Sequence, residues 1–188
     1  MLALSQRTEI DCGSGRGNFT IEGAREHPDT TFIGVDINLN QHKVSEAARR
    51  KSQLPNAHFV HAEVKDYLVR YVPDATISAF HVYFPTPHMS SIIRENALAQ
   101  DLRGWLISPG FIEELRRAAL PGATMRFATD HRPYANEVSQ LVARMNLTVL
   151  PWTEPLAHKS VGDLVGTGCE RAMRRRGRDI HFLQCALR

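Results

Sequence analysis

Short apolar runs alternate along the chain with segments rich in alanine and charged residues. The run TFIGVD at Thr31–Asp36 is typical of a buried strand, and Ala75–Phe84 is the longest strand candidate. Further strands are predicted at Thr8–Cys12, His58–His61, Ala123–Thr129, Leu147–Leu150 and Ile180–Leu187. Helices are predicted at about 19–26, 40–51, 65–71, 111–119 and 133–145. This alternation favours an α/β fold with a mainly parallel sheet.

Two stretches need separate interpretation. Pro121-Gly122 follows the helix predicted at 111–119 and is expected to end it. Leu156–Arg178 shows neither a helical nor a strand period, so we expect a functional loop or a mobile segment there.

The length of 188 residues suits one α/β domain with a full core and is too short for two, so 1–188 is predicted to form a single domain.

Composition narrows the class of protein. Hydrophobic residues make up 43% of the chain and charged residues 23%, as in soluble globular domains. The net charge of +3 weakly favours a polyanionic partner. Three cysteines without CxxC spacing favour reduced thiols in a cytoplasmic protein over a disulfide framework or a zinc site. The chain contains no apolar run of the roughly 18–20 residues that a membrane span needs, so no membrane association is expected.

A glycine-rich turn follows the first predicted strand, in the sequence Glu9-Ile-Asp-Cys-Gly13-Ser-Gly15-Arg-Gly17. Glycines let the backbone turn sharply and let a ligand approach it closely. Such a turn at the carboxyl end of the first strand is where open α/β sheets bind nucleotide-like ligands. The spacing is GxGxG, and Asn18 stands where the dinucleotide fingerprint GxGxxG has its last glycine. A tight strand–helix turn without a ligand is the alternative interpretation.

Acidic residues near this turn indicate the kind of ligand. Asp36 ends the second predicted strand, where its carboxylate can accept hydrogen bonds from two adjacent ribose hydroxyls. Glu9 and Asp11 favour a cationic ligand such as S-adenosylmethionine over a dinucleotide, whose pyrophosphate they would repel. Glu63 follows the third predicted strand, where it is either an acceptor for an adenine amino group or a solvated loop carboxylate.

These motifs and two later ones resemble those of the bacterial tRNA (guanine-N7)-methyltransferases. The markers are EI-x-CGSG at 9–15, FIGVD at 32–36, the block 109–135 with its ATD followed by Pro-Tyr-Ala, and Thr167-Gly-Cys-Glu170. The resemblance implies a Rossmann-like class I S-adenosylmethionine-dependent methyltransferase fold, with a doubly wound seven-stranded sheet whose last strand is antiparallel. It also implies a cytoplasmic, metal-free enzyme that methylates a guanine of tRNA. We expect a monomer or a homodimer.

Carried over residue by residue, the resemblance implies specific roles. The donor contacts are expected at Glu9, Gly13, Gly15, Asp36 and Glu63. Guanine contacts are expected at Asp130, Thr167 and Glu170, with Arg171 beside them as a substrate contact and Asp130 as a catalytic residue. Carboxylates near the guanine would stabilise the positive charge that develops on its ring.

Each substrate-side residue also has a plainer interpretation. TDHRPY resembles a helix start with a capping aspartate, so Asp130 is also a candidate N-cap. Thr167 and Glu170 suit an ordinary turn. Arg171 begins a cluster with Arg174, Arg175, Arg176 and Arg178, which suits either RNA docking or a solvated basic loop.

One segment departs from the family pattern. The family carries FPDPW followed by a basic run after the fourth strand, whereas this chain has FPTPH at 84–88 and a mostly uncharged insert at about 89–102. Thr86, the second predicted catalytic residue, replaces the family's acid and supplies a hydroxyl without charge. Two alternatives therefore stand beside tRNA methylation: a methyltransferase with another small-molecule or RNA substrate, and a catalytically weak RNA-binding relative.

Overall fold

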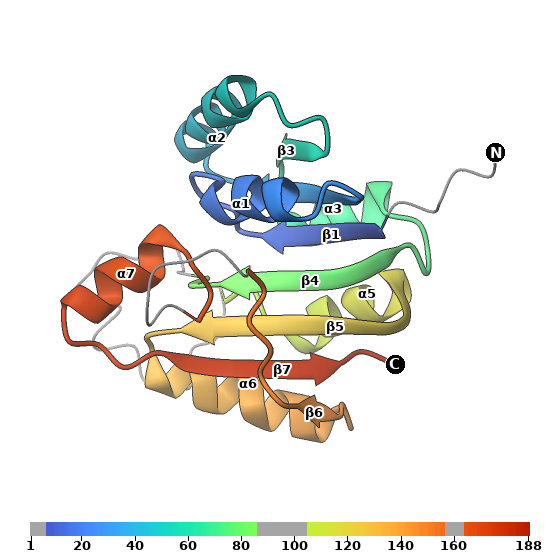
Figure 1. The fold of residues 1–188 in the computed structure, drawn as a ribbon. Coiled ribbons are helices and arrows are strands. Elements are labelled where there is room, and N and C mark those ends of the chain that lie inside the picture. Colours follow the sequence, from blue (N-terminus) through green and yellow to red (C-terminus); the bar gives the residue numbers. More distant parts are fainter. Residues whose placement is uncertain (1–6, 86–104, 157–163) are drawn as a thin grey trace.

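Seven strands form one twisted sheet through the centre of the molecule (Figure 1). The computed structural model describes residues 7–85, 105–156 and 164–188. The strands are β1 (Arg7–Cys12), β2 (Thr30–Asp36), β3 (Ala57–His61), β4 (Ile77–Tyr83), β5 (Ala119–Thr129), β6 (Val149–Leu150) and β7 (His181–Ala186). Their order is β3-β2-β1-β4-β5-β7-β6. Strands β1 to β5 pair in parallel and β7 is antiparallel to β5, which confirms the predicted doubly wound sheet.

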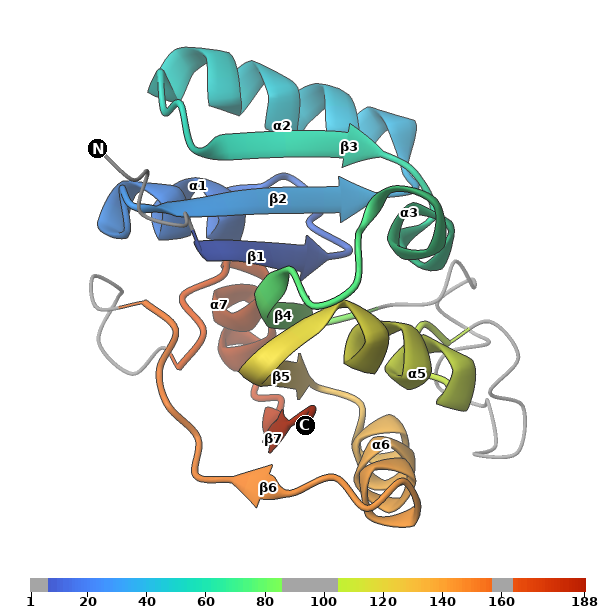
Figure 2. The same cartoon turned by 90° about the vertical axis from the view of Figure 1, so that its right-hand side faces the viewer.

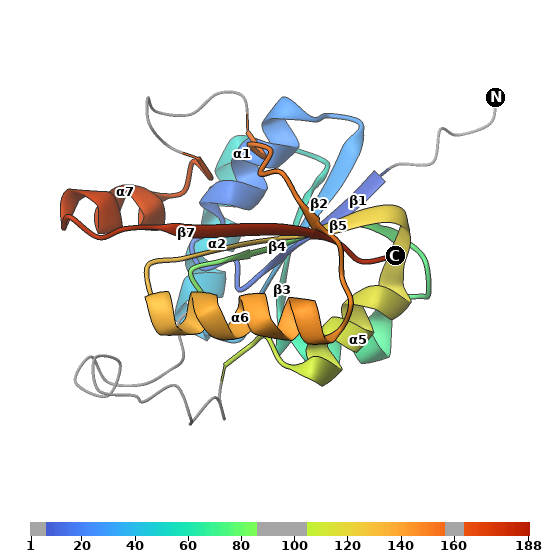
Figure 3. The same ribbon diagram turned by 90° about the horizontal axis from the view of Figure 1, so that it is seen from below.

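Helices cover both faces of this sheet (Figure 3). They are α1 (Asn18–Glu26), α2 (Leu39–Ser52), α3 (Val64–Tyr71), α5 (Pro109–Ala118), α6 (Arg132–Arg144) and α7 (Gly168–Arg175). α1 and α2 contact each other on one face, while α3 and α5 contact each other on the opposite face, where α6 also lies. The sheet is thus the middle layer of three.

The strand order reverses between β1 and β4. From β1 the chain moves outward through β2 to β3, and then returns to place β4 on the other side of β1. Because β1, β2 and β4 are parallel, their carboxyl ends meet at one edge of the sheet (Figure 2). In open α/β sheets this edge, at the reversal of strand order, is where ligands bind.

The two faces of the sheet differ in chemistry because side chains alternate between them along each strand. One face packs against α3, α5 and α6 through a continuous buried apolar cluster, which includes Ile10, Cys12, Phe80, Val82, Met125 and Phe127. Alternate positions of the same strands carry polar side chains on the opposite face, namely Glu9, Asp11, His81, Tyr83, Arg126 and Gln184. The apolar face supplies most of the core, and the polar face leads to the cavity described below.

The boundary between α5 and β5 differs from the prediction. The helix ends at Ala118 and the strand begins at Ala119, so Pro121-Gly122 lies inside β5 and does not end a helix. The pairing of β4 with β5 shifts register between Ile77 and Ala79, next to this dipeptide. Gly122 has a φ of 80°, which glycine adopts without strain. A proline and a glycine are tolerated in a strand at such an irregularity.

Two further predictions need correction. The segment predicted as a loop at 156–178 contains the helix α7, and β6 covers only Val149–Leu150 of the strand predicted at 147–150. Helix α7 has the sequence GCERAMRR and buries only Glu170. A helix that buries one polar side chain leaves no apolar period in its sequence, which explains why the prediction missed it.

Candidate functional site

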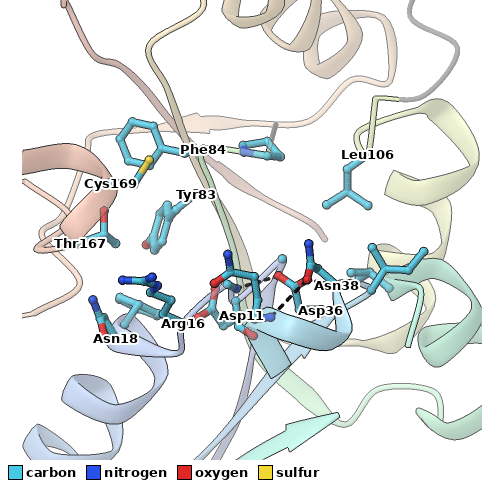
Figure 4. Close-up of a pocket in the computed structure, with 18 of the residues that line it drawn as sticks. Asp11, Arg16, Asn18, Asp36, Asn38, Tyr83, Phe84, Leu106, Thr167 and Cys169 are labelled. Atoms are coloured by element: carbon cyan, nitrogen blue, oxygen red, sulfur yellow. Dashed lines mark hydrogen bonds between the residues drawn. The ribbon is translucent and has the colours of Figure 1, made fainter. Parts of the chain in front are cut away.

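A cavity of about 890 Å³ lies at the carboxyl ends of β1, β2 and β4, where the strand order reverses (Figure 4). Segments from the glycine turn, the start of α3, the residues before α5 and the start of α7 complete its walls. The predicted site residues that line it are Gly13, Gly15, Asp36, Glu63 and Thr167. Four others lie outside its lining, namely Glu9, Asp130, Glu170 and Arg171. Thr86 lies outside the described residues.

The glycine turn and the end of β2 form one hydrogen-bonded unit. The N–H of Gly15 donates to Oδ2 of Asp36 over 2.7 Å, and the N–H of Asn38 donates to Oδ1 over 2.7 Å. Gly13 and Gly15 have φ values of 84° and 54°, and a Cβ atom added at either position would meet no atom within 4 Å. The turn therefore leaves an open approach to the backbone beside a fixed carboxylate.

Asp11 is a buried carboxyl group in the wall of the cavity, with 3% of its surface exposed. The hydroxyl of Thr20 donates to its Oδ2 over 2.8 Å. Burial raises the pKa of Asp11 to about 7 against the opposing effect of this hydrogen bond, and the charge of Asp36 raises it further. A cation in the cavity would lower this pKa again, so Asp11 is suited to bind a positively charged group.

Glu9 lies two residues earlier on β1 and does not line the cavity. Its Oε2 is 2.8 Å from Nε2 of the fully buried His81 on β4. Burial would raise the pKa of Glu9, but the hydrogen bond from His81 and the nearby charges of Arg126 and Arg7 outweigh it and hold the pKa below its ordinary value. Glu9 is therefore an ionised carboxylate bound to a histidine rather than open to a ligand.

Glu63 lies at the start of α3. It is the N-cap of α3, where its Oε2 accepts the N–H of Asp66 over 2.8 Å. Glu63 also lines the cavity. The cap fixes the orientation of the carboxylate and leaves it at the cavity wall.

Helix α7 begins at the cavity through an N-terminal cap. The hydroxyl oxygen of Thr167 accepts the N–H of Glu170 over 3.0 Å, and Thr167, Gly168 and Cys169 line the cavity. Glu170 is completely buried. Its two oxygens accept the N–H groups of residues 164, 165 and 166 and two N–H groups of Arg174, at 2.8–3.0 Å.

This bonding contradicts an open guanine contact at Glu170 in the described structure. Five hydrogen bonds occupy its two oxygens, and none of its surface is exposed. Burial would raise the pKa of Glu170, but the backbone N–H groups and Arg174 outweigh it and hold the pKa below its ordinary value. Glu170 thus holds the start of α7, including Thr167, against the cavity.

Asp130 follows the last residue of β5 and faces Arg178. Its Oδ2 lies 3.7 Å from Nε of Arg178. The N-cap of α6 is His131, whose Nδ1 accepts the N–H of Tyr134 over 3.2 Å, so the capping role considered for Asp130 is wrong. Asp130 lies at the same edge of the sheet as the cavity but not in its lining.

The arginines after Glu170 divide into bound and solvent-facing groups. Arg171 donates to the carbonyl oxygen of Gly166 over 3.2 Å, and Arg174 pairs with Glu170. Arg175 and Arg176 are exposed at the end of α7. The exposed pair lies at the C-terminal end of α7, whereas the cavity residue Thr167 caps its N-terminal end.

The family follows from a comparison of the whole chain with known families. A family model described as "Putative methyltransferase" matches residues 5–183. The chain belongs to this family. The match includes the glycine turn, the cavity carboxyl groups of Asp11, Asp36 and Glu63, and helix α7.

Curated relatives are 30–32% identical to this chain over 137 aligned residues. A tRNA (guanine-N(7)-)-methyltransferase of Rubrobacter xylanophilus is 30% identical over 137 residues, which are 72% of this chain and 57% of the relative. A tRNA (guanine-N(7)-)-methyltransferase of Caulobacter sp. is 32% identical over 72% of this chain and 56% of the relative. The chain thus spans slightly more than half the length of the curated relatives it matches.

Solved structures confirm the methyltransferase fold. A SAM dependent methyltransferase from Aquifex aeolicus superposes with a TM-score of 0.63 at 15% identity, covering 99% of this chain and 86% of the other. The 16S rRNA methyltransferase KamB gives a TM-score of 0.65 at 21% identity, covering 98% and 90%. The Rossmann-like class I methyltransferase fold predicted from the sequence is confirmed.

Two polar residues at or next to the cavity were not predicted as site residues from the sequence, namely Tyr83 and His81. Tyr83, which has no role in the sequence-based prediction, lines the cavity beside Thr167 and Cys169 (Figure 4), and its hydroxyl oxygen lies 2.8 Å from Nδ1 of His81. The sequence held one sign of these two residues, because His81 and Tyr83 alternate with Val82 in an otherwise apolar strand and so face the same side of the sheet.

Within residues 7–85, 105–156 and 164–188, no three His, Cys, Asp or Glu side chains are grouped so as to hold a metal ion. Among the helices of those same segments, none is long and apolar enough to cross a bilayer.

Proposed function

We propose that this methyltransferase transfers a methyl group from S-adenosylmethionine to N7 of a guanine in tRNA. The observation that carries the proposal is the cavity at the strand-order reversal, which combines an open glycine turn with the carboxyl groups of Asp11 and Asp36. The names of the relatives, tRNA (guanine-N(7)-)-methyltransferase, support the substrate.

The cavity fits the donor part by part. Each oxygen of Asp36 already accepts one backbone N–H and has a second lone pair for a ribose hydroxyl. Gly13 and Gly15 leave room for the donor against the backbone. We assign the donor's ammonium to Asp11, the carboxyl group of β1 that lines the cavity, and its adenine amino group to the oxygen of Glu63 that does not cap α3.

On the substrate side, Thr167 is the predicted guanine contact that lines the cavity. We assign Glu170 as a positioning residue, because its carboxylate holds residues 164–167 and has no exposed surface. Asp130 would meet the guanine at the cavity rim if incoming substrate replaced its pairing with Arg178, a contact of 3.7 Å. Arg171, Arg175 and Arg176 would bind tRNA phosphates near α7.

Methyl transfer to guanine N7 requires the protein mainly to position the two reactants. The donor supplies an activated methyl group on a sulfonium, and the lone pair of guanine N7 points outward without a proton to remove. The chain's residues therefore orient the two reactants, exclude water and supply negative potential where positive charge moves onto the guanine ring. We assign this role to Asp130, directly after β5, and to the ionised Glu170 in the first turn of α7.

One observation favours a second candidate, a methyltransferase with another substrate. The two acids implied for guanine lie outside the cavity lining, one paired with Arg178 and the other fully buried. Among the described residues, the lining on that side of the cavity includes Thr167, Cys169, Tyr83 and Phe84, which suit a substrate that needs no carboxylate partner.

A comparison of substrates in separate reactions distinguishes the two candidates. The purified chain is incubated with radiolabelled S-adenosylmethionine and, in separate reactions, with unmodified tRNA, unmodified 16S rRNA transcript or a small-molecule cell extract. Label in tRNA alone supports the proposal. Label in either other fraction and none in tRNA contradicts it and supports the second candidate. Asp36→Ala serves as the control, because it removes the ribose acceptor and should abolish label in every fraction.

A further inference from the structure

A buried chain of hydrogen bonds connects Glu9 to the cavity. Oε2 of Glu9 lies 2.8 Å from Nε2 of His81, and Nδ1 of His81 lies 2.8 Å from the hydroxyl oxygen of Tyr83. Glu9 belongs to β1, and His81 and Tyr83 to the neighbouring strand β4, on the same face of the sheet. Tyr83 lines the cavity, whereas Glu9 does not. The three side chains thus lead from a remote carboxylate to the cavity wall.

The protons of this chain have one consistent arrangement. The ionised carboxylate of Glu9 only accepts, so Nε2 of His81 must carry a hydrogen. Burial lowers the pKa of His81 despite the bond to Glu9, so the ring is neutral near pH 7 and its Nδ1 has no hydrogen. Burial also raises the pKa of Tyr83 well above its ordinary value, so its phenol keeps its hydrogen. Tyr83 therefore donates to Nδ1, and its oxygen is left with lone pairs only.

The surroundings keep this arrangement in place. From α1, the ring of Phe19 packs 4.5 Å from the ring of His81 and 5.0 Å from that of Tyr83. From β5, the cation of Arg126 opposes protonation of His81 and is itself held by Gln184 and Thr153. Asp11 on β1 and Glu170 on α7 add negative potential at Tyr83. Within the relay, His81 is fully buried and Tyr83 is nearly so, with 7% of its surface exposed.

We propose that Glu9 acts on the methyl donor through His81 and Tyr83, by holding the Tyr83 oxygen as an acceptor at the cavity wall. This inference rests on the proposed function, because it needs a cationic donor in the cavity. Figure 4 shows the Tyr83 ring between Thr167 and Cys169 on one side and Asp11 and Arg16 on the other. An oxygen that presents only lone pairs there attracts the donor's cationic methionine portion and repels a negatively charged group. His81 is the positioning residue of this relay.

The relay makes donor binding sensitive to protonation of His81. Once both ring nitrogens carry hydrogens, Nδ1 donates to the Tyr83 oxygen, and the phenol hydrogen turns toward the cavity. A cationic donor then meets a hydrogen instead of a lone pair. Donor affinity should therefore fall as the pH drops through the lowered pKa of His81.

The test compares donor affinity over pH in four proteins. S-adenosylmethionine is titrated calorimetrically from about pH 4.5 to about pH 8.5, a range that extends about two units below the ordinary pKa of histidine, into wild type, His81→Gln, Tyr83→Phe and His58→Gln. The glutamine amide can donate to Glu9 and accept from Tyr83 but cannot be protonated. His58 is exposed on β3 and serves as the matched control. Asp11 titrates in all four proteins, so its effect cancels in the affinity ratios.

The proposal predicts distinct profiles. Wild type and His58→Gln should lose affinity at acid pH about 3- to 10-fold more than His81→Gln does, which corresponds to one hydrogen bond. Tyr83→Phe should bind about 3- to 10-fold more weakly at pH 8 and lack the extra loss at acid pH. Nitrogen-15 NMR of the unliganded protein should show the Nε2–H tautomer of His81. If His81→Gln does not fold, Tyr83→Phe against wild type carries the comparison.

Several results would overturn this inference. Donor binding with the same pH profile in wild type, His81→Gln and Tyr83→Phe would contradict the relay but would leave the proposed function unaffected. The Nδ1–H tautomer of His81 would do the same. An absence of donor binding at every pH would overturn the proposed function, and this inference with it.

Discussion

The backbone N–H of Gly15 donates to Oδ2 of Asp36 over 2.7 Å, which joins the glycine turn after β1 to the carboxylate that ends β2. The two residues are 21 positions apart in the sequence. One carboxylate thus shapes the turn and presents its remaining lone pairs to the cavity. Removing it should affect both the ligand and the loop.

Asp36→Ala should reduce donor affinity and stability together. It removes the acceptor for the ribose hydroxyls and leaves the N–H groups of Gly15 and Asn38 without their partner. We expect donor affinity to fall at least about 10-fold, and the free energy of unfolding by about 1–3 kcal/mol. Calorimetric titration and urea unfolding measure the two effects. Asp29→Ala, at an exposed position before β2, is the control and should change neither; equal donor binding by Asp36→Ala and wild type would remove Asp36 from the donor site.

Asp11 should couple donor binding to proton release. Its pKa is about 7 in the unliganded protein, so near pH 7 about half of the molecules carry its proton. A bound ammonium group lowers this pKa, and roughly half a proton should be released per donor bound at pH 7. Calorimetric titration in two buffers of different ionisation enthalpy measures that number. Asp11→Asn should bind the donor more weakly and release no proton; the same release by both proteins would rule out this role.

The same carboxyl group should limit stability at neutral and alkaline pH. Its pKa is raised by folding, so its favourable contribution is complete below the unfolded value of 3.8 and is lost as the pH rises toward about 7. The difference corresponds to at most roughly 4 kcal/mol. Asp11→Asn should therefore be more stable than wild type at pH 8, and the gap should close at pH 4. Urea unfolding at the two pH values measures this, and a gap independent of pH would contradict it.

Glu170→Gln should loosen the start of α7. The neutral amide cannot accept the N–H groups of residues 164–166 and Arg174 as the carboxylate does, and its NH₂ group would face these donors. Loss of a buried, hydrogen-bonded charge of this kind costs about 2–4 kcal/mol. Amide hydrogen exchange should accelerate at 164–170, and methylation should fall through misplacement of Thr167. Glu113→Gln on the exposed side of α5 is the control; unchanged exchange in Glu170→Gln would contradict the positioning role.

Because folding lowers the pKa of Glu170, the stability of α7 should also depend on pH. The carboxylate contributes its stabilisation above its unfolded pKa and loses it as the pH falls through the lowered folded value. Exchange at 164–170 should therefore accelerate toward acid pH, beyond the intrinsic pH dependence of exchange, in wild type but not in Glu170→Gln.

Arg175→Ala combined with Arg176→Ala should weaken tRNA binding uniformly across tRNA sequences. Both side chains are exposed at the end of α7, and each would neutralise one phosphate. The slope of log affinity against log salt should become less steep by about 1.5 units, since each phosphate contact contributes roughly 0.7–0.9. Filter binding at several salt concentrations measures this. Arg50→Ala with Lys51→Ala, at the end of α2, is the matched control, and equal slopes in both double variants would place the RNA surface elsewhere.

The sequence was sufficient for the fold because its apolar runs alternate clearly. TFIGVD at 31–36 became β2, and the GxGxG spacing placed the turn at the end of β1. Boundaries were less predictable where tertiary contacts decide them. Pro121-Gly122 lies within β5, next to a shift in the register of the β4–β5 pairing. The local sequence cannot predict such a shift, because it depends on the neighbouring strand.

The site was only partly predictable for a related reason. Motif spacing identified Gly13, Gly15 and Asp36, since one turn and one strand end determine their position. Motif spacing could not distinguish Glu9 from Asp11, because both side chains lie on the same face of β1. Only Asp11 lines the cavity, whereas Glu9 bonds to His81 in the neighbouring strand β4. The burial of Glu170 depends in the same way on the backbone of 164–166.

The most direct test of the account is the identity of the methylated nucleoside. Bulk tRNA from cells that lack their own guanine-N7 activity is incubated with the chain and labelled S-adenosylmethionine, digested and analysed by mass spectrometry. The account predicts labelled 7-methylguanosine with wild type and none with Asp36→Ala. Labelled tRNA without 7-methylguanosine, or no label while the donor binds in a calorimeter, would contradict the assignment of guanine N7.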